Sequence, residues 1–119
     1  MNLTHLIDKI KKHPDYDKAG MILCHNGIVR STSRDGRKVS GLKVRVNHEK
    51  LNKVIKENKK KPGIVEILVE IADNKDLLIG DDVMLLVVAG DIRENVISTL
   101  RDTLNAIKTT VTSKTEFFE

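Results

Sequence analysis

The sequence predicts an α+β domain in which helical and strand-like segments alternate along one chain. Apolar residues recur at helical spacing in three segments, and apolar and polar residues alternate in others. Val83–Ala89 is a continuous apolar run, typical of a buried central strand. A chain of 119 residues suits one domain with one core, so we assign residues 1–119 to a single domain. We expect three helices with an antiparallel or mixed sheet.

The first half of the chain alternates between helical and extended patterns. Helical spacing predicts a short first helix that ends before Pro14: Leu3, Leu6, Ile7 and Ile10. A strand pattern runs from Ala19 to Arg30, with a bulge or turn near Gly27 where polar residues interrupt it. The alternation in Val39–Asn47 predicts a half-buried strand, and His48–Lys61 reads as a second helix that the following Pro62-Gly63 ends.

The second half supplies two more strands and a long helix. Ile64–Ala72 alternates, Asp73–Asp76 is a turn, and the segment Leu77–Asp82 leads into the apolar run Val83–Ala89. A final helix begins near Asp91, whose carboxylate can accept a bond from an N–H of the first turn. Its apolar stripe consists of Val96, Ile97, Leu100, Leu104 and Ile107. A threonine-rich tail after Lys108 predicts a terminal strand.

Composition restricts the function. The chain is 39% hydrophobic and 32% charged, as in soluble globular proteins, and no apolar run reaches the roughly 20 residues that span a bilayer. The single Cys24 cannot form an internal disulfide, which favours a reducing cytoplasm, and it reads as a core residue rather than a nucleophile. The net charge of +4 favours anionic partners. Because aromatic residues make up only 3%, base-stacking surfaces are scarce, and we expect no nucleic-acid partner.

Two cationic features remain open to two interpretations. Lys108 closes the last helix, where a cation complements the helix dipole, so its charge can be purely structural. The loop around Ser31–Lys38 gathers four cations: Arg30, Arg34, Arg37 and Lys38. They can belong to a solvated hairpin, or they can form an oxyanion or phosphate site, because guanidinium groups make bidentate bonds. The histidines and Cys24 lack paired ligand spacing, so we expect no metal and no cofactor.

Three motifs resemble the family of the large, catalytic subunit of molybdopterin synthase. In that family a His-Arg pair begins the last helix, a Lys closes it, and a Lys and a Glu follow in the tail. Arg93, Lys108, Lys114 and Glu116 match these positions, the last two with one residue deleted. Gly27–Leu42 resembles the family's Gly-x-Val-Arg element, loop and Gly-Arg-x-Val, and Leu77–Asp81 resembles its Leu-x-x-Gly-Asp.

The resemblance also shows departures. Ile92 stands where the family has His, Ala72-Asp73 stands where it has a His-Arg pair, and the Pro and Trp of the tail are missing. In the family, an arginine near the second of these places helps form the neighbouring subunit's active site. The resemblance covers the chain from Ala19 onward.

The resemblance implies an α/β hammerhead fold, a homodimer within a heterotetramer, and sulfur transfer in molybdenum cofactor biosynthesis. Sulfur would pass from a thiocarboxylate on a ubiquitin-like small subunit to cyclic pyranopterin monophosphate, giving molybdopterin. Lys108 is the first catalytic candidate and Lys114 the second, with the neighbouring Thr115 as the other tail position. The expected substrate-binding residues are Arg30, Arg93, Arg37 and Lys38.

Two alternatives to an active synthase subunit stay open at the level of sequence. A divergent, non-catalytic paralogue could bind a ubiquitin-like tail or a pterin without completing the transfer, and Ile92 and Ala72-Asp73 favour it. A small RNA-binding domain is supported by the net charge alone.

Overall fold

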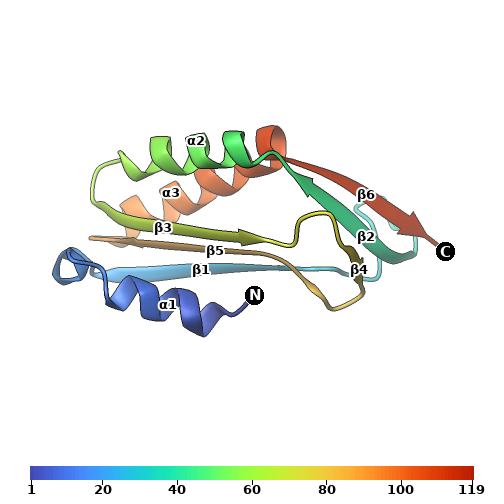
Figure 1. The fold of residues 1–119 in the computed structure, drawn as a ribbon, viewed down its shortest axis with the longest axis horizontal. Helices are drawn as coiled ribbons and strands as arrows, with labels where there is room; N and C mark the ends of the chain where they lie inside the picture. Colours follow the sequence, from blue (N-terminus) through green and yellow to red (C-terminus); the bar gives the residue numbers. More distant parts are fainter.

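The computed structural model describes residues 1–119 as three α-helices and two three-stranded antiparallel sheets (Figure 1). The first sheet has the order β1 (Met21–Ile28), β5 (Asp82–Gly90), β3 (Ile64–Ile71). The second has the order β4 (Asp76–Leu78), β2 (Val39–Val46), β6 (Thr112–Phe118). The helices are α1 (Leu3–Lys11), α2 (His48–Lys59) and α3 (Arg93–Ala106). The predicted α+β class is confirmed.

The first sheet lies between helices on both of its faces, with α1 on one side and α2 and α3 on the other (Figure 1). Its central strand, β5, is buried from Met84 to Gly90. Leu85, Val87 and Ala89 pack against Leu6 and Ile10 of α1. Leu86 and Val88 face the opposite way, toward Val96 of α3. Burial on both faces is the reason that this strand is apolar throughout, as the sequence predicted.

Capping and turn residues define the element boundaries close to the predicted ones. The side chain of Asn2 accepts a hydrogen bond from the His5 N–H at the start of α1, and that of Asn47 accepts one from Lys50 at the start of α2. The predicted irregularity near Gly27 is confirmed, because the β1–β5 register shifts between Gly27 and Ile28. The short strand β4 was not predicted, since three residues are too few to show alternation.

The last helix differs from its predicted stripe in one position and in its cap. Ile97 is 49% exposed, and Thr99 and Thr103 are buried instead. Burial of Thr103 is tolerated because its hydroxyl donates to the Thr99 carbonyl at 2.7 Å. The carboxylate of Asp91 accepts hydrogen bonds from the backbone N–H of Ile92 and from the side-chain amide of Asn95. Asp91 therefore bonds to the N–H of the cap residue Ile92, one of the N–H groups that a helix start leaves unpaired, so the predicted bond is present but lies one residue before the first turn.

A five-residue π-helical turn, Ile107–Val111, joins α3 to β6. Two threonine hydroxyls donate to carbonyls at the end of α3: Thr109 to Asn105 at 2.9 Å and Thr110 to Ala106 at 2.7 Å. Ile107 and Val111 are buried in the core below α2, whereas Lys108 between them is exposed. Single π turns of this kind occur frequently at functional sites.

The second sheet extends the molecule to a length of 48 Å, and it meets the first sheet where Asp73, just after β3, forms a bridge to Val44 of β2. On its inner face Leu42 and Val44 of β2 pack with Val29, Ala72 and Leu77. Asp73 fixes the junction: its carboxylate accepts from the Val46 N–H at 3.0 Å and lies 2.8 Å from His48 Nε2. The hydrogen bond from His48, followed by the one from Val46, holds the pKa of the Asp73 carboxyl below its usual range.

Candidate functional site

Lys108 and Lys114 lie on the same hollow surface, although one belongs to the π turn and the other to β6. Both line a cavity of about 260 Å³ that also contains Arg34 and Thr112. The floor of this cavity is apolar and comes from both sheets: Val44, Ile71, Val83 and Met84. Lysine charges above an apolar floor make a site for an anionic molecule with a flat or partly apolar body.

Strand register explains why Lys114 faces this cavity. Lys114 pairs with Val44 in the β2–β6 ladder, and Val44 is buried on the inner face. Its neighbour Thr115 pairs with Lys43, on the outer face. Because successive side chains in a strand point to opposite faces, only one of the two can reach Lys108. Of the two tail positions considered from the sequence, the structure places Lys114 at the cavity.

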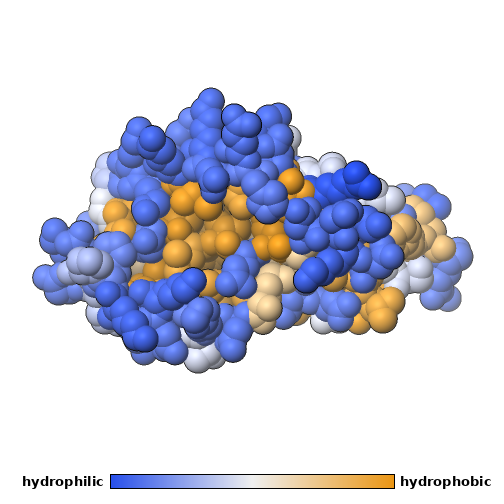
Figure 2. All heavy atoms as spheres, viewed as in Figure 1, coloured by the Kyte–Doolittle hydropathy of each residue, from blue (hydrophilic) through white to orange (hydrophobic).

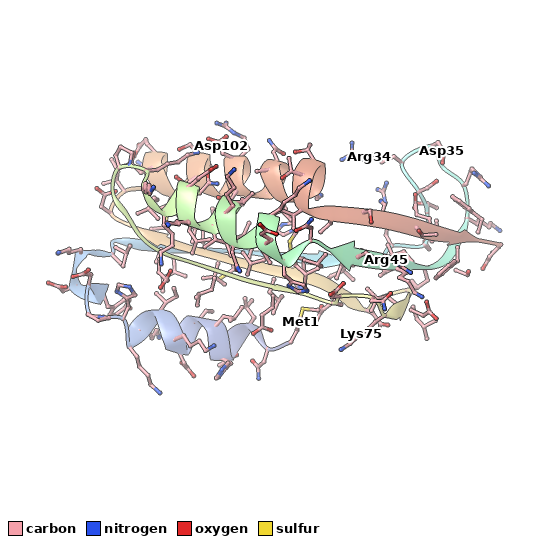
Figure 3. All side chains as sticks on the ribbon, turned by 45° about the horizontal axis from the view of Figure 1, so that its top comes forward. Met1, Arg34, Asp35, Arg45, Lys75 and Asp102 are labelled. Atoms are coloured by element: carbon pink, nitrogen blue, oxygen red, sulfur yellow. The ribbon has the colours of Figure 1, made fainter.

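The loop between β1 and β2 adds guanidinium groups to one side of the same hollow. An adjoining depression is lined by Arg30 and Arg34 together with both lysines, and Glu116 is its one carboxylate. Figure 3 shows Arg34 reaching from the loop toward the end of α3, whereas Asp35 lies at the outer side of the loop. Glu116 lies 4.0 Å from Lys114 and offsets only part of the positive charge.

The loop is organised by short-range hydrogen bonds. Two backbone hydrogen bonds join the outgoing and returning halves of the loop. The Ser33 N–H donates to the Arg37 carbonyl at 2.9 Å, and the Val39 N–H donates to the Ser31 carbonyl at 2.9 Å. The buried Ser33 hydroxyl contacts the Asp35 carboxylate and accepts from the Arg37 N–H. Gly36 adopts a φ of 85°, a conformation that favours glycine.

A third depression, of about 180 Å³, brings His25 beside the two lysines. His25 lies on β1 opposite Leu86, and its ring shares this space with Gly27, Met84 and Lys108. Burial lowers the pKa of His25 from its ordinary 6.5, and the positive charge of Lys108 lowers it further. The imidazole is therefore neutral at pH 7.

Two of the expected substrate-binding residues, Arg37 and Lys38, do not line these depressions. The Arg37 guanidinium stacks on the ring of Phe118, with 3.6 Å between its central carbon and the ring centroid. Lys38 is exposed, and its carbonyl accepts from the Glu119 N–H at the end of β6. Both side chains therefore belong to the outer end of the second sheet.

Arg93 lies at the other end of α3 from Lys108. It lines a separate, open depression with Gly20 and Asp91. The 14 residues of α3 place these two ends about 21 Å apart. Within one chain, Arg93 is therefore not part of the lysine cavity, whereas Arg30, Lys108 and Lys114 are brought together.

Cys24 is half-buried, at the margin of the core rather than inside it. Its side chain packs against the apolar cluster between α1 and β5, and burial raises the pKa of the thiol. A raised pKa disfavours the thiolate, which is the nucleophilic form.

None of the helices is long and apolar enough to cross a membrane.

The fold and the cavity together define an α+β protein with a cationic, apolar-floored site between two antiparallel sheets, a helix end and a terminal strand. The family model described as MoaE protein matches residues 2–110. The chain belongs to the MoaE family, which confirms the resemblance to the large subunit of molybdopterin synthase. The match includes α1, which the sequence motifs did not reach, and it ends before Lys114.

Solved structures support the same fold. Molybdopterin synthase from Staphylococcus aureus is 23% identical, with a TM-score of 0.74 over 87% of this chain and 77% of that chain. Molybdopterin cofactor biosynthesis protein E from Burkholderia multivorans is 18% identical, with a TM-score of 0.79 over 100% of this chain and 82% of that one. A complex of subunits 1 and 2 of the molybdopterin-converting factor from Helicobacter pylori is 19% identical, with a TM-score of 0.74 over 100% and 80%. No curated protein matches the chain.

Proposed function

We propose that this chain is the catalytic large subunit of a molybdopterin synthase. In this role it transfers sulfur from the thiocarboxylate of a ubiquitin-like small subunit to cyclic pyranopterin monophosphate. Membership of the MoaE family supports the biosynthetic role. The observation that carries the catalytic proposal is the shared cavity of Lys108 and Lys114, because two elements bring these lysines to one apolar-floored hollow.

The charges of the site suit both reactants. A phosphate and a thiocarboxylate are anions, and four cations line the connected depressions against one carboxylate: Lys108, Lys114, Arg30 and Arg34, with Glu116 opposite. Arg30 and Arg34 are suited to hold the phosphate through paired N–H donors. The apolar floor is suited to the face of the pterin ring. We assign Lys108, and then Lys114, to charge stabilisation or proton transfer at the sulfur.

The remaining expected residues need another chain or another loop position to reach the substrate. Arg93 lies the length of α3 away from the lysine cavity of its own chain. It can therefore contact substrate only if the start of its helix reaches the lysine cavity of a second protomer. Arg37 and Lys38 can close over the substrate only if the Arg37–Phe118 contact opens. We retain all three as proposed substrate-binding residues on these terms.

The partner and the setting follow from the same proposal. The Helicobacter pylori structure is a complex of two subunits of the molybdopterin-converting factor, which supports a small-subunit partner for this chain. We propose a homodimer of large subunits within a heterotetramer, in the cytoplasm, with residues 1–119 acting as one domain of the hammerhead type.

Reconstitution tests the proposed function directly. The purified chain is mixed with a thiocarboxylated small subunit and cyclic pyranopterin monophosphate, and molybdopterin is measured over time. We expect product that depends on both partners. Tight binding of the small subunit without any product would overturn the catalytic proposal.

That last outcome would favour the second candidate, a non-catalytic paralogue that binds a ubiquitin-like tail or a pterin. Two observations support it. Asp73 stands at the place of a family arginine, and its carboxylate is held by His48 and by the Val46 N–H. Ile92, at the place of a family histidine, is 53% exposed and supplies no titratable group.

We expect the chain to be a homodimer in solution. One edge of β3 is unpaired, and most of its apolar side chains are only half-buried. Figure 2 shows an apolar area in the middle of the molecular surface that carries β3, between the polar surfaces of α2 and α1. An exposed strand edge beside apolar surface favours association. Light scattering at micromolar concentration should give twice the 13.4 kDa mass of the chain, and a monomeric mass would contradict the prediction.

We expect the loop Ser31–Lys38 to become more ordered when substrate binds. Arg34 projects from this loop into the cavity, so an anion held there would restrain the loop backbone. Hydrogen exchange of the loop amides should slow on addition of cyclic pyranopterin monophosphate, while exchange in α1, outside the site, should not change. Equal exchange rates in the loop with and without substrate would exclude it from the site.

A further inference from the structure

His25 is the one imidazole in the lysine hollow, and the local backbone leaves its ring accessible. Side chains of β1 alternate, so His25 shares a face with Gly27. A Cβ placed on Gly27 would lie 3.3 Å from His25 Nε2, tighter than most such contacts. The absence of a side chain at Gly27 therefore leaves room for the ring between β1 and Lys108.

The ring of His25 has no hydrogen-bond partner within the chain. His13 and His48 each have an acidic or backbone partner, but neither nitrogen of His25 does. No buried side-chain nitrogen or oxygen is left unsatisfied, so the His25 nitrogens are reached from the hollow rather than sealed in the core. A neutral imidazole in this position offers one N–H donor and one free lone pair to a molecule in the cavity.

The charged groups around His25 are cations. Lys108 from the π turn and Lys114 from β6 line the same depression, and Arg34 and Arg30 line the adjoining ones. Glu116 lines the neighbouring depression and lies beside Lys114. Ammonium and guanidinium groups donate hydrogen bonds and have no lone pair to accept a proton. His25 is thus the group in this depression that can accept one.

We propose that His25 acts as the general base for the water that releases the small subunit from the transferred sulfur, an inference that rests on the proposed function. The sulfur of the thiocarboxylate forms a C–S bond to a carbon of the pterin side chain and displaces an oxygen substituent, which leaves with the electron pair of the broken C–O bond. In the resulting thioester the sulfur still holds the acyl carbon of the small subunit. Water then attacks that acyl carbon: a C–O bond forms, the C–S bond breaks, and its electron pair goes to sulfur. His25 takes one proton from the water, and the second leaves as the new carboxyl group ionises.

The products of this step also fit the surroundings. The reaction needs no oxidant or reductant, because a thioester and water give a carboxylate, a thiolate and two protons. Lys108 and Lys114 are placed to stabilise the thiolate and the carboxylate, while His25 supplies the basic nitrogen that these cations lack. This division of work makes His25 a catalytic residue distinct from the lysines.

A single-turnover experiment with His25→Gln tests the inference. The variant keeps a hydrogen-bonding side chain but cannot take up a proton near neutral pH. Reconstituted with thiocarboxylated small subunit and cyclic pyranopterin monophosphate, it should form molybdopterin on the order of 10²-fold more slowly. Mass spectrometry should then detect the covalent adduct of small subunit and pterin accumulating, with small-subunit affinity unchanged. His5→Gln, an exposed histidine of α1, is the matched control and should behave as the unmutated protein.

The pH profile separates a base from a positioning role. In the unmutated protein the rate should fall below pH 6.5, as the imidazole with its lowered pKa becomes protonated. This acidic limb should be absent in His25→Gln and in His25→Phe. Unchanged turnover in His25→Gln, or an acidic limb that persists in both variants, would overturn the inference while the proposed function stands. Failure of the unmutated protein to form product would overturn the proposed function, and the inference with it.

Discussion

Replacing Lys108 by alanine should nearly abolish molybdopterin formation while the protein keeps its fold and its small-subunit affinity. Lys108 is exposed at the end of α3, and a cation there contributes at most about 1 kcal/mol to stability through the helix dipole. A positioned proton donor or charge stabiliser contributes roughly 10²- to 10⁴-fold in rate. Loss of its ammonium from the cavity should therefore lower the rate far more than it lowers stability.

The measurement combines turnover in the reconstituted assay with thermal unfolding of each variant. Lys53→Ala is the matched control, because Lys53 is an exposed lysine in the middle of α2, outside the cavity. It should retain full activity. Product formation by Lys108→Ala at the rate of the unmutated protein would keep the synthase function and remove Lys108 from its mechanism. A large fall in unfolding temperature would instead assign the residue a structural role.

The sequence predicted the elements well where a single physical pattern dominates. The apolar run Val83–Ala89 is typical of a strand that is buried on both faces, and it is the centre of the first sheet. Ile97 was misassigned to the core because hydrophobicity alone selected it. The buried face of α3 instead includes Thr103, whose hydroxyl is satisfied by its own helix.

The site was predictable in part. Lys108 and Lys114 match positions of the family motif. However, nothing local in the sequence indicates the π turn after α3, which allows β6 to pair with β2 and so brings Lys114 close to Lys108. Among the loop arginines, charge could not distinguish Arg34, which lines the cavity, from Arg37, which stacks on Phe118. That distinction depends on the internal bonds of the loop. In the sequence, His25 is only one of the polar residues that interrupt an apolar strand near Gly27, and its proposed role depends on long-range packing against the end of α3.

Replacing Lys114 by alanine should slow molybdopterin formation on the order of 10²-fold, less than the loss expected for Lys108→Ala. Its side chain is 55% exposed and lies beside Glu116, so water and the carboxylate already weaken its field at the substrate. Lys114→Arg keeps the charge and should retain more activity than Lys114→Ala. Initial rates in the reconstituted assay, at saturating substrate, provide the comparison.

The strand alternation of β6 makes this prediction sharper. A lysine introduced by Thr115→Lys should not restore activity to Lys114→Ala, because position 115 pairs with Lys43 on the outer face of the second sheet. Thr115→Lys alone should be as active as the unmutated protein, which controls for the added charge. Restored turnover in the double variant would mean that β6 presents its other face to the cavity in solution. Full activity of Lys114→Ala would leave Lys108 as the only lysine that the chemistry requires.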